Sequence, residues 1–265
     1  TAGDTTAGDT TAGDTTGEVP TGGVTASGVA TGFTTVGLGF DGVVLRMGNG
    51  LSWITADPVL ERGVRAGAAT SMPLLANWAA RRGLAGMEFT IAIPGSVGGA
   101  VRMNAGAHGG EIVDTLTSVT VFDLDAVAVS ERPAASLDMT YRHSNLTDRD
   151  VVLDASFELR LDEESAVRAR MESYRKHRAE TQPGALQNAG STFKNPAGDS
   201  AGRLVEAAGL KGHRVGKVSV SELHANFFIA EDGATAQDVF DLVHEVRRLV
   251  AERMGVELQP EVRFV

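Results

Sequence analysis

Cysteine is absent from the 265 residues, and its absence removes several kinds of chemistry. A chain without thiols forms no disulfide, offers no thiolate to a metal, and has neither a cysteine nucleophile nor a cysteinyl-linked flavin. Because cytoplasmic proteins characteristically do without disulfides, we expect a cytoplasmic location.

Clusters of basic residues and long apolar runs are also missing. The net charge is −10 and no block of Lys and Arg occurs, which argues against a nucleic-acid or anionic-membrane partner. No run reaches the roughly 18 apolar residues that suggest a transmembrane helix, and the amino terminus does not resemble a secretory signal. The six histidines include no pair at metal-ligand spacing, so we expect no metal site.

The first 38 residues contain little apolar surface and no Lys or Arg. They hold three copies of TAGDT followed by a stretch rich in Thr, Gly and Ala. This composition offers little burial to offset the entropy lost on ordering, so it predicts disorder over 1–38. A β structure built from the repeats is the alternative.

From about Gly39 the composition is that of a folded protein. The pattern predicts a strand over 41–47, a hairpin at Asn49-Gly50, strands over 119–122 and 151–161, and helices over 70–83, 163–180, 199–209 and 235–255. Asp199 is the expected cap of the third helix, and Thr235 with Asp238 resembles a capping box for the fourth. Strands and helices mix without regular alternation, which indicates the α+β class.

A glycine-rich segment runs from Ile93 to Gly106. Glycines allow positive φ and close approach, so successive N–H groups are able to form a concavity for a diphosphate. The segment matches neither the dinucleotide fingerprint nor the P-loop. A turn packed tightly against a sheet is the alternative, and composition alone slightly favours it.

A second segment, NAGSTFKNP, spans 188–196. Its hydroxyl beside a glycine, followed by a cation and an amide, is suited to supplying a proton donor together with anion-binding groups. No Gly-x-Ser-x-Gly sequence occurs, which argues against a serine hydrolase. Alternatively, Ser191 only bonds the backbone of a loop. Tyr141-Arg142 and Gln259-Pro260-Glu261-Val262, taken singly, indicate no more than surface charge.

Taken in order and spacing, IPGSVGGAVRMNAGAHGGEI, YRHS, NAGSTFKNP, AGRLVEAAGLKGHRVG and ELQPEVRFV resemble the UDP-N-acetylenolpyruvoylglucosamine reductase (MurB) family over roughly 40–265. The resemblance implies an FAD-binding domain of the vanillyl-alcohol-oxidase (PCMH) type, incomplete over 39–161, and a smaller α+β substrate-binding domain over 162–265. The short run from Thr181 to Asn188 resembles the type of family member that lacks an extra tyrosine loop.

The resemblance also implies the chemistry. Non-covalently bound FAD would be reduced by NADPH, and the enolpyruvyl ether of UDP-N-acetylglucosamine would then be reduced to UDP-N-acetylmuramate for peptidoglycan. Ser191 would donate a proton, Arg142 would stabilise developing charge, and Glu261 would complete the acid–base set. The implied flavin contacts are Pro94, Gly95, Ser96, Val97, Gly98, Gly99, Asn104, Ala105 and Gly106, and the implied substrate contacts are Tyr141, Lys194, Asn195 and Arg178.

The chain departs from the family pattern at its start. The family has a flavin-gripping lobe before the equivalent of Gly39, and here the TAGDT tract stands in its place. Ala92 and Leu223 replace the usual glycine and lysine. Two alternatives to an active reductase follow. One is a non-catalytic remnant that binds UDP-sugar but holds FAD poorly. The other is a flavin oxidase with another substrate, which the Ser191, Arg142 and Glu261 set disfavours.

Overall fold

The computed structural model describes residues 45–184 and 186–264. The segment expected to be disordered, 1–38, and most of the strand predicted over 41–47 lie outside the described residues. The hairpin predicted at Asn49-Gly50 is wrong, because Asn49–Leu51 forms a 3₁₀ helix, η1. Its last carbonyl, that of Leu51, accepts the Ala69 N–H at 2.9 Å, so the turn ties the chain to a distant loop and not to a neighbouring strand.

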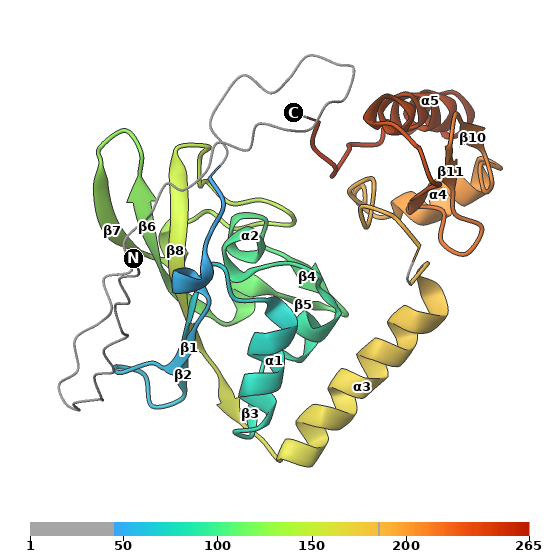
Figure 1. The fold of residues 1–265 in the computed structure, drawn as a ribbon. Coiled ribbons are helices and arrows are strands. Elements are labelled where there is room, and N and C mark those ends of the chain that lie inside the picture. The colour runs from blue at the N-terminus through green and yellow to red at the C-terminus, as the bar shows by residue number, and fades with distance from the viewer. Residues whose placement is uncertain (1–44, 185, 265) are drawn as a thin grey trace, which may run out of the picture.

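The first unit is built on a five-stranded antiparallel sheet of order β1-β2-β8-β6-β7 (Figure 1). Residues alternate between its two faces. Val64 and Ala66 share one face with their partners Phe157 and Ala155, whereas Arg65 lies on the other, where it donates to Asp154 at 2.7 and 3.1 Å. The sheet is therefore apolar toward the helices and polar on its other face. The strands are β1 Ile54–Ala56, β2 Gly63–Gly67, β6 Leu116–Asp123, β7 Ala128–Pro133 and β8 Asp150–Glu158.

Helices α1, Met72–Ala80, and α2, Val97–Arg102, join this core. The predicted start of α1 is confirmed: the Ser71 hydroxyl accepts from the Leu74 N–H, and a proline stands in the first turn. Gly83, at φ +62°, follows the helix as expected of a glycine in the left-handed region.

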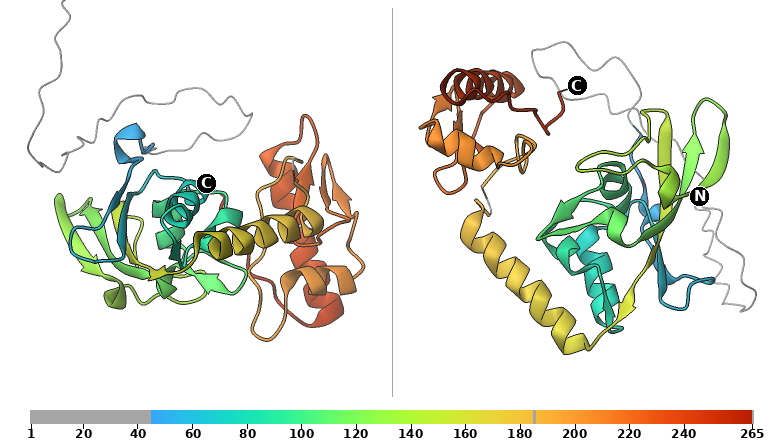
Figure 2. Two further views of the ribbon diagram at one scale, coloured as in Figure 1. Left: turned by 90° about the horizontal axis from the view of Figure 1, so that it is seen from below. Right: turned by 180° about the vertical axis from the view of Figure 1, so that it is seen from behind.

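Helix α3, Glu164–Thr181, runs from the first unit toward the second (Figures 1 and 2). Its buried residues Val167 and Met171 pack with Ala76, Ala80 and other residues of the first unit. The second domain expected over 162–265 includes this helix, but its apolar stripe packs against the first unit.

Short elements complete the first unit. Two small ladders pair β3 with β9 and β4 with β5. Their bounds, with those of the 3₁₀ helices, are β3 Leu84–Ala85, β4 Gly106–Ala107, β5 Gly110–Glu111, β9 Arg160–Leu161, η2 Glu88–Ala92, η3 Ile112–Asp114 and η4 Ala134–Ser136.

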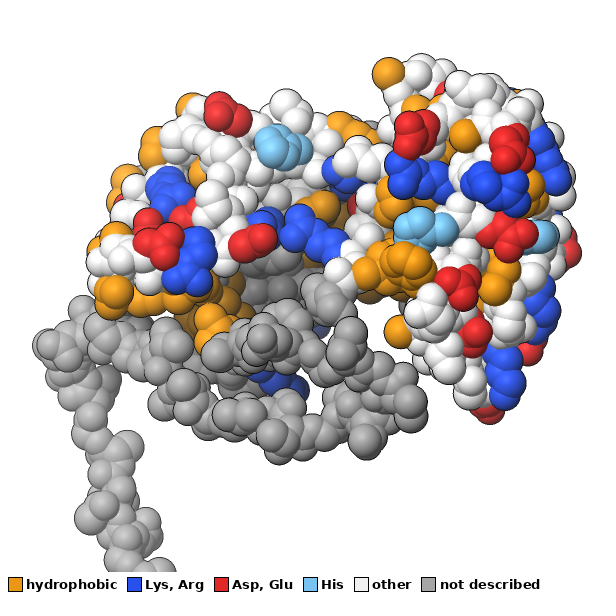
Figure 3. All heavy atoms as spheres, turned by 90° about the horizontal axis from the view of Figure 1, so that it is seen from above, with side chains coloured by type: hydrophobic (Ala, Val, Ile, Leu, Met, Phe, Trp, Pro, Cys, Tyr) orange, Lys and Arg blue, Asp and Glu red, His pale blue; other side chains and the backbone are white. Residues whose placement is uncertain are grey.

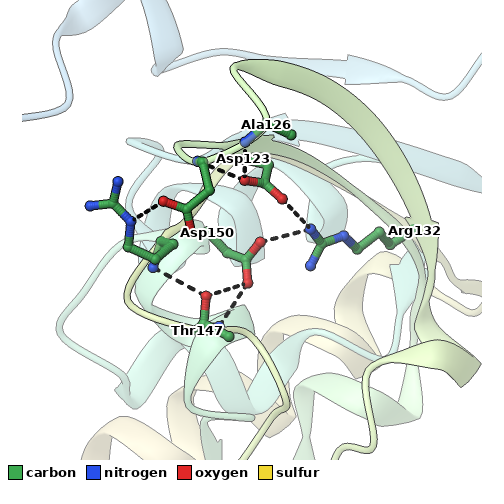
Figure 4. A network of polar contacts seen from close by, with 7 residues as sticks. Asp123, Ala126, Arg132, Thr147 and Asp150 are labelled. Carbon is green, nitrogen blue, oxygen red and sulfur yellow. Dashed lines mark hydrogen bonds and ion pairs between the residues drawn. The ribbon is translucent and has the colours of Figure 1, made fainter.

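A polar network joins the β6–β7 hairpin to the turn before β8 (Figure 4). The Asp150 carboxylate, with a side chain only 6% exposed, accepts from the Arg132 guanidinium at 2.7 Å and from the Thr147 N–H at 2.7 Å. Burial alone would raise the pKa of Asp150, but these hydrogen bonds outweigh it and hold the pKa below the ordinary 3.8. The network fixes the start of β8.

The second unit is a three-stranded antiparallel sheet with two helices. The capping box predicted from Thr235 and Asp238 is confirmed at the start of α5, and Gly255 at φ +69° ends that helix. The cap predicted at Asp199 is wrong, because Ser200 accepts from the Arg203 N–H and caps α4, while Asp199 pairs with the Arg203 side chain. The elements are α4 Ala201–Ala207, β10 Arg214–Val215, β11 Val218–Val220, β12 Phe228–Ala230 and α5 Ala236–Met254.

Within 45–184 and 186–264, no helix combines the length and apolar character that crossing a membrane requires. The same residues contain no cluster of three His, Asp or Glu side chains able to hold a metal ion. After α5 the chain turns back toward the first unit (Figure 1), which brings the end of the chain to the site described next.

Candidate functional site

Three segments that are distant in the sequence meet at one place. The Arg142 Nε donates to the Glu261 Oε1 at 3.0 Å. Lys194 Nζ donates to the Arg142 carbonyl at 3.4 Å, and the Asn195 N–H donates to the Tyr141 hydroxyl at 3.2 Å. The fold therefore brings together five of the residues expected at the site: Tyr141, Arg142, Lys194, Asn195 and Glu261.

Arg142 is held in an uncommon conformation. Its φ is +54°, in the left-handed region that non-glycine residues seldom adopt. A second guanidinium nitrogen, Nη2, donates to the Gly106 carbonyl at 2.9 Å, and the guanidinium carbon lies 4.9 Å from the centre of the Tyr141 ring. Side-chain exposure is 18% for Arg142 and 23% for Glu261, so the ion pair is partly shielded from water. Backbone strain of this kind is frequent where function fixes a side chain.

The segment 191–194 lies like a short strand between two other segments, joined to each by an isolated β-bridge. Ser191 pairs with Phe227 on one side, and Phe193 pairs with Pro260 on the other. The Glu261 N–H donates to the Thr192 carbonyl at 2.8 Å. The backbone of Glu261 is thus bonded to Thr192, the residue that follows Ser191. The turn before Ser191 is set by Gly190 at φ +79°, whose N–H donates to the Asn188 side chain at 2.9 Å.

A cavity of about 220 Å³ lies at this meeting point. Its lining contains several cationic side chains and a single carboxylate, so it is suited to an anion. On the face drawn in Figure 3, Lys and Arg side chains gather in the hollow between the two units. Sequence reasoning missed Arg102 and Arg263, although the latter stands only two residues after Glu261. The lining residues are Arg102, Met103, Arg142, His143, Ser144, Leu146, Lys194, Gln259, Pro260, Glu261 and Arg263.

The glycine-rich segment forms a concavity of N–H groups only in part. The Val97 N–H donates to the Thr70 carbonyl at 2.9 Å, and the Gly98 N–H donates to the Ala68 carbonyl at 3.0 Å. These two amides are already bonded, so they are not free to bind a diphosphate. A Cβ on Gly98 would lie 3.1 Å from the Ala68 Cβ. At Gly98, the alternative of a turn packed tightly against its surroundings is confirmed.

The outer side of the same turn is open. Pro94, Gly95 and Gly99 are exposed, and Ser96 is half-buried. A Cβ on Gly95 would meet nothing within 4 Å, and one on Gly99 only the Ser96 hydroxyl at 3.9 Å. A flat ligand could approach this backbone closely, so these residues fit a flavin.

Asn104 to Gly106 shape the site from inside. Asn104 is fully buried; its amide donates to Glu111 at 2.8 Å and to the Thr140 carbonyl at 3.0 Å, and accepts from Val113 at 3.0 Å. The Ala105 N–H donates to the Ala100 carbonyl. The side-chain amide of Asn104 thus bonds neighbouring parts of the fold, and the Gly106 carbonyl accepts a hydrogen bond from the guanidinium of Arg142.

Arg178 lies apart from the cavity lining. Its guanidinium donates to the carbonyl of Ala92, and burial lowers its pKa from the ordinary value of an arginine. Nearby on α3, the Tyr174 ring stacks on His108 with centroids 4.3 Å apart. The structure therefore does not gather Arg178 with Arg142 and Lys194.

Comparisons with known proteins bear on both units. Residues 182–265 match the family model of the UDP-N-acetylenolpyruvoylglucosamine reductase C-terminal domain, and residues 22–129 match that of an FAD binding domain. The UDP-N-acetylenolpyruvoylglucosamine reductase of Sphingopyxis alaskensis is 44% identical over 231 residues, which cover 86% of this chain and 75% of that protein. That of Acidiphilium cryptum is 44% identical over 227 residues, covering 86% and 72%. The chain belongs to the UDP-N-acetylenolpyruvoylglucosamine reductase family.

The crystal structure of UDP-N-acetylenolpyruvylglucosamine reductase (MurB) from Thermus caldophilus has the same fold. It aligns with a TM-score of 0.68 and 39% identity over 75% of this chain and 71% of that one. The expected α+β architecture, an FAD-binding domain followed by the MurB C-terminal domain, is confirmed. The family and its FAD-binding domain make the chain a flavin-dependent oxidoreductase.

Proposed function

We propose that this reductase uses NADPH and non-covalently bound FAD to reduce UDP-N-acetylglucosamine enolpyruvate to UDP-N-acetylmuramate, a peptidoglycan precursor, in the cytoplasm. The main support is the 3.0 Å Arg142–Glu261 ion pair, which joins a turn of the first unit to the end of the chain. It lies beside the strand of Ser191 and lines a basic cavity.

Each of the three residues has a role that follows from its chemistry. When bound and reduced, FAD would supply the hydride needed at the methylene carbon of the enolpyruvyl group. Arg142 holds the carboxylate and stabilises the negative charge that develops beside it, as a planar fork does well. Ser191 donates the proton that completes the reduction at the carbon bearing that carboxylate. Glu261 orients Arg142 and completes the acid–base set at the site.

The remaining predicted residues bind the ligands. Lys194 lines the cavity, and Asn195 follows it in the chain and bonds the Tyr141 hydroxyl. Lys194 and Asn195 are proposed to contact the nucleotide diphosphate, and Tyr141 to contact the substrate. Arg178 is proposed as a further substrate contact, on the resemblance alone. The flavin site would be lined by the turn 94–99, with its open glycines, and supported by 104–106. We propose 39–161 and 162–265 as the flavin and substrate domains, although the match to the FAD binding domain begins earlier, at residue 22, and that to the C-terminal domain later, at residue 182.

NADPH oxidation at 340 nm tests this proposal. Protein supplied with FAD is expected to be yellow, to oxidise NADPH only when UDP-N-acetylglucosamine enolpyruvate is present, and to form UDP-N-acetylmuramate in equal amount. Oxidation that is independent of this substrate would contradict the proposal. Colourless protein that still binds the UDP-sugar would support the non-catalytic remnant instead.

A further inference from the structure

Asn226, in the turn between β11 and β12, makes an unusual set of bonds with the strand that contains Ser191. It is only 3% exposed. Its side-chain oxygen accepts the Phe193 N–H at 2.9 Å, and its side-chain nitrogen donates to the Phe193 carbonyl at 2.8 Å. Its own carbonyl accepts the Thr192 N–H at 2.8 Å. One residue thus bonds three backbone groups of the consecutive residues Thr192 and Phe193.

The two side-chain bonds copy the pairing of an antiparallel strand. They need a donor and an acceptor a short distance apart, which is what a primary amide provides. An alanine here would leave the N–H and the carbonyl of Phe193 buried without these partners, and each such group costs stability.

Asn226 is itself anchored on both sides. Its N–H donates to the His224 Nδ1 at 3.2 Å, and the His224 N–H donates to the Ser221 hydroxyl at 3.3 Å. On the other side of the strand, the Thr192 carbonyl accepts the Glu261 N–H at 2.8 Å. A continuous series of hydrogen bonds therefore runs from Ser221 through Asn226 to Glu261 and passes the residue next to Ser191.

We propose that Asn226 is a positioning residue for the protonation step. Its side-chain amide and backbone carbonyl hold Phe193 and Thr192 against the turn before β12, and Thr192 in turn bonds the Glu261 backbone. This support keeps the Ser191 hydroxyl and the Glu261 carboxylate placed for the substrate together. Asn226 acts through these residues and does not itself touch the substrate. The inference rests on the function proposed above. Because misplacement of a reacting group by about 1 Å can cost about a hundredfold in rate, loss of this amide should slow protonation selectively.

Two variants separate the roles of the donor and the acceptor. Asn226→Ala removes both. Asn226→Asp, when ionised, keeps an acceptor for the Phe193 N–H but turns a carboxylate oxygen toward the Phe193 carbonyl. When protonated, the same Asp regains a donor and restores both bonds. The ratio of the Asn226→Asp rate to the wild-type rate should therefore rise as the pH falls, and the ratio for Asn226→Ala should stay flat.

Stopped-flow absorbance of the FAD-loaded protein measures the two half-reactions apart. We expect Asn226→Ala, and Asn226→Asp wherever its carboxyl is ionised, to slow reoxidation by UDP-N-acetylglucosamine enolpyruvate about tenfold to a hundredfold, while reduction by NADPH changes less than about twofold. Hydrogen exchange at the Thr192 and Phe193 amides should become faster in Asn226→Ala. The control is Leu242→Ala, a truncation in the core of the same unit, which should lower the melting temperature without separating the half-reactions.

Three results would each overturn the positioning role. The first is equal slowing of both half-reactions. The second is a ratio of the Asn226→Asp rate to the wild-type rate that does not change with pH, and the third is selective slowing of reoxidation in Leu242→Ala as well. A wild-type protein whose reduced flavin is not reoxidised by this substrate would contradict the proposed function instead. In that case the exchange measurement decides the inference: unchanged exchange at Thr192 and Phe193 overturns it, and faster exchange supports it.

Discussion

Replacing Arg142 by lysine keeps the positive charge but removes the planar guanidinium and its several donors. The guanidinium donates to two partners at once, Glu261 at 3.0 Å and the Gly106 carbonyl at 2.9 Å. An ammonium is a point charge and does not reproduce this planar arrangement. The pair is partly exposed, so the loss of one charge-assisted hydrogen bond is discounted for solvent screening to about 1–2 kcal/mol of unfolding free energy.

The effect on the reaction should be larger than the effect on stability. If Arg142 stabilises charge that develops on the substrate, loss of the aligned donor should lower kcat by about 10²- to 10³-fold. Urea denaturation measures the change in unfolding free energy, and steady-state reduction of UDP-N-acetylglucosamine enolpyruvate measures the change in kcat. Arg142→Lys protein that keeps more than about a third of the wild-type kcat would refute the reasoning.

Arg149→Lys is the matched control. Arg149 Nε donates to Asp125 at 2.8 Å, but side-chain exposure in this pair is 57% and 69%, and neither residue lines the site. The same substitution there should change stability by less than about 0.5 kcal/mol and leave kcat unchanged.

Three further predictions concern stability and pH. Gly106→Ala should destabilise the protein by about 1–3 kcal/mol in thermal denaturation, because its Cβ would lie 2.8 Å from the Glu111 side chain; unchanged stability would contradict the close packing there. Burial lowers the pKa of His224 below 6.5, so the unfolded chain binds more protons and stability is lost as the pH falls from about 7 to about 5; His224→Gln should flatten this slope, and an unaltered slope would assign it to other groups. Asp150 has a lowered pKa, so its contribution is present at neutral pH and is lost as the pH falls through 3.8 and below. Asp150→Asn should cost about 1–3 kcal/mol at pH 7 and reduce the acid sensitivity measured by denaturant titration.

Local signals predicted the helices well. The apolar stripe and capping box of α5 and the cap of α1 depend on residues three or four apart, which interact on one helix face regardless of the remaining fold. The predictions at Asn49-Gly50 and Asp199 failed for a related reason. Each residue type suits several local structures, and contacts from elsewhere decided between them: Ala69 bonds the end of the 3₁₀ helix, and the neighbouring Ser200 takes the cap.

The site was less accessible to sequence reasoning. Arg142 and Glu261 are 119 residues apart, and only the resemblance to a family indicated that they meet. Glycines in series suggested free N–H groups, but whether an amide is free depends on carbonyls such as those of Ala68 and Thr70, which composition does not place. Asn226 gave no signal, because a buried amide becomes recognisable only by its partners.

Ser191→Ala followed in the two half-reactions tests the central claim most directly. Removal of the hydroxyl should leave reduction of the bound flavin by NADPH nearly unchanged and slow its reoxidation by UDP-N-acetylglucosamine enolpyruvate by about 10²- to 10⁴-fold, the contribution of a general acid. Equal loss in both half-reactions, or full retention of both, would contradict the assignment of Ser191 as the proton donor.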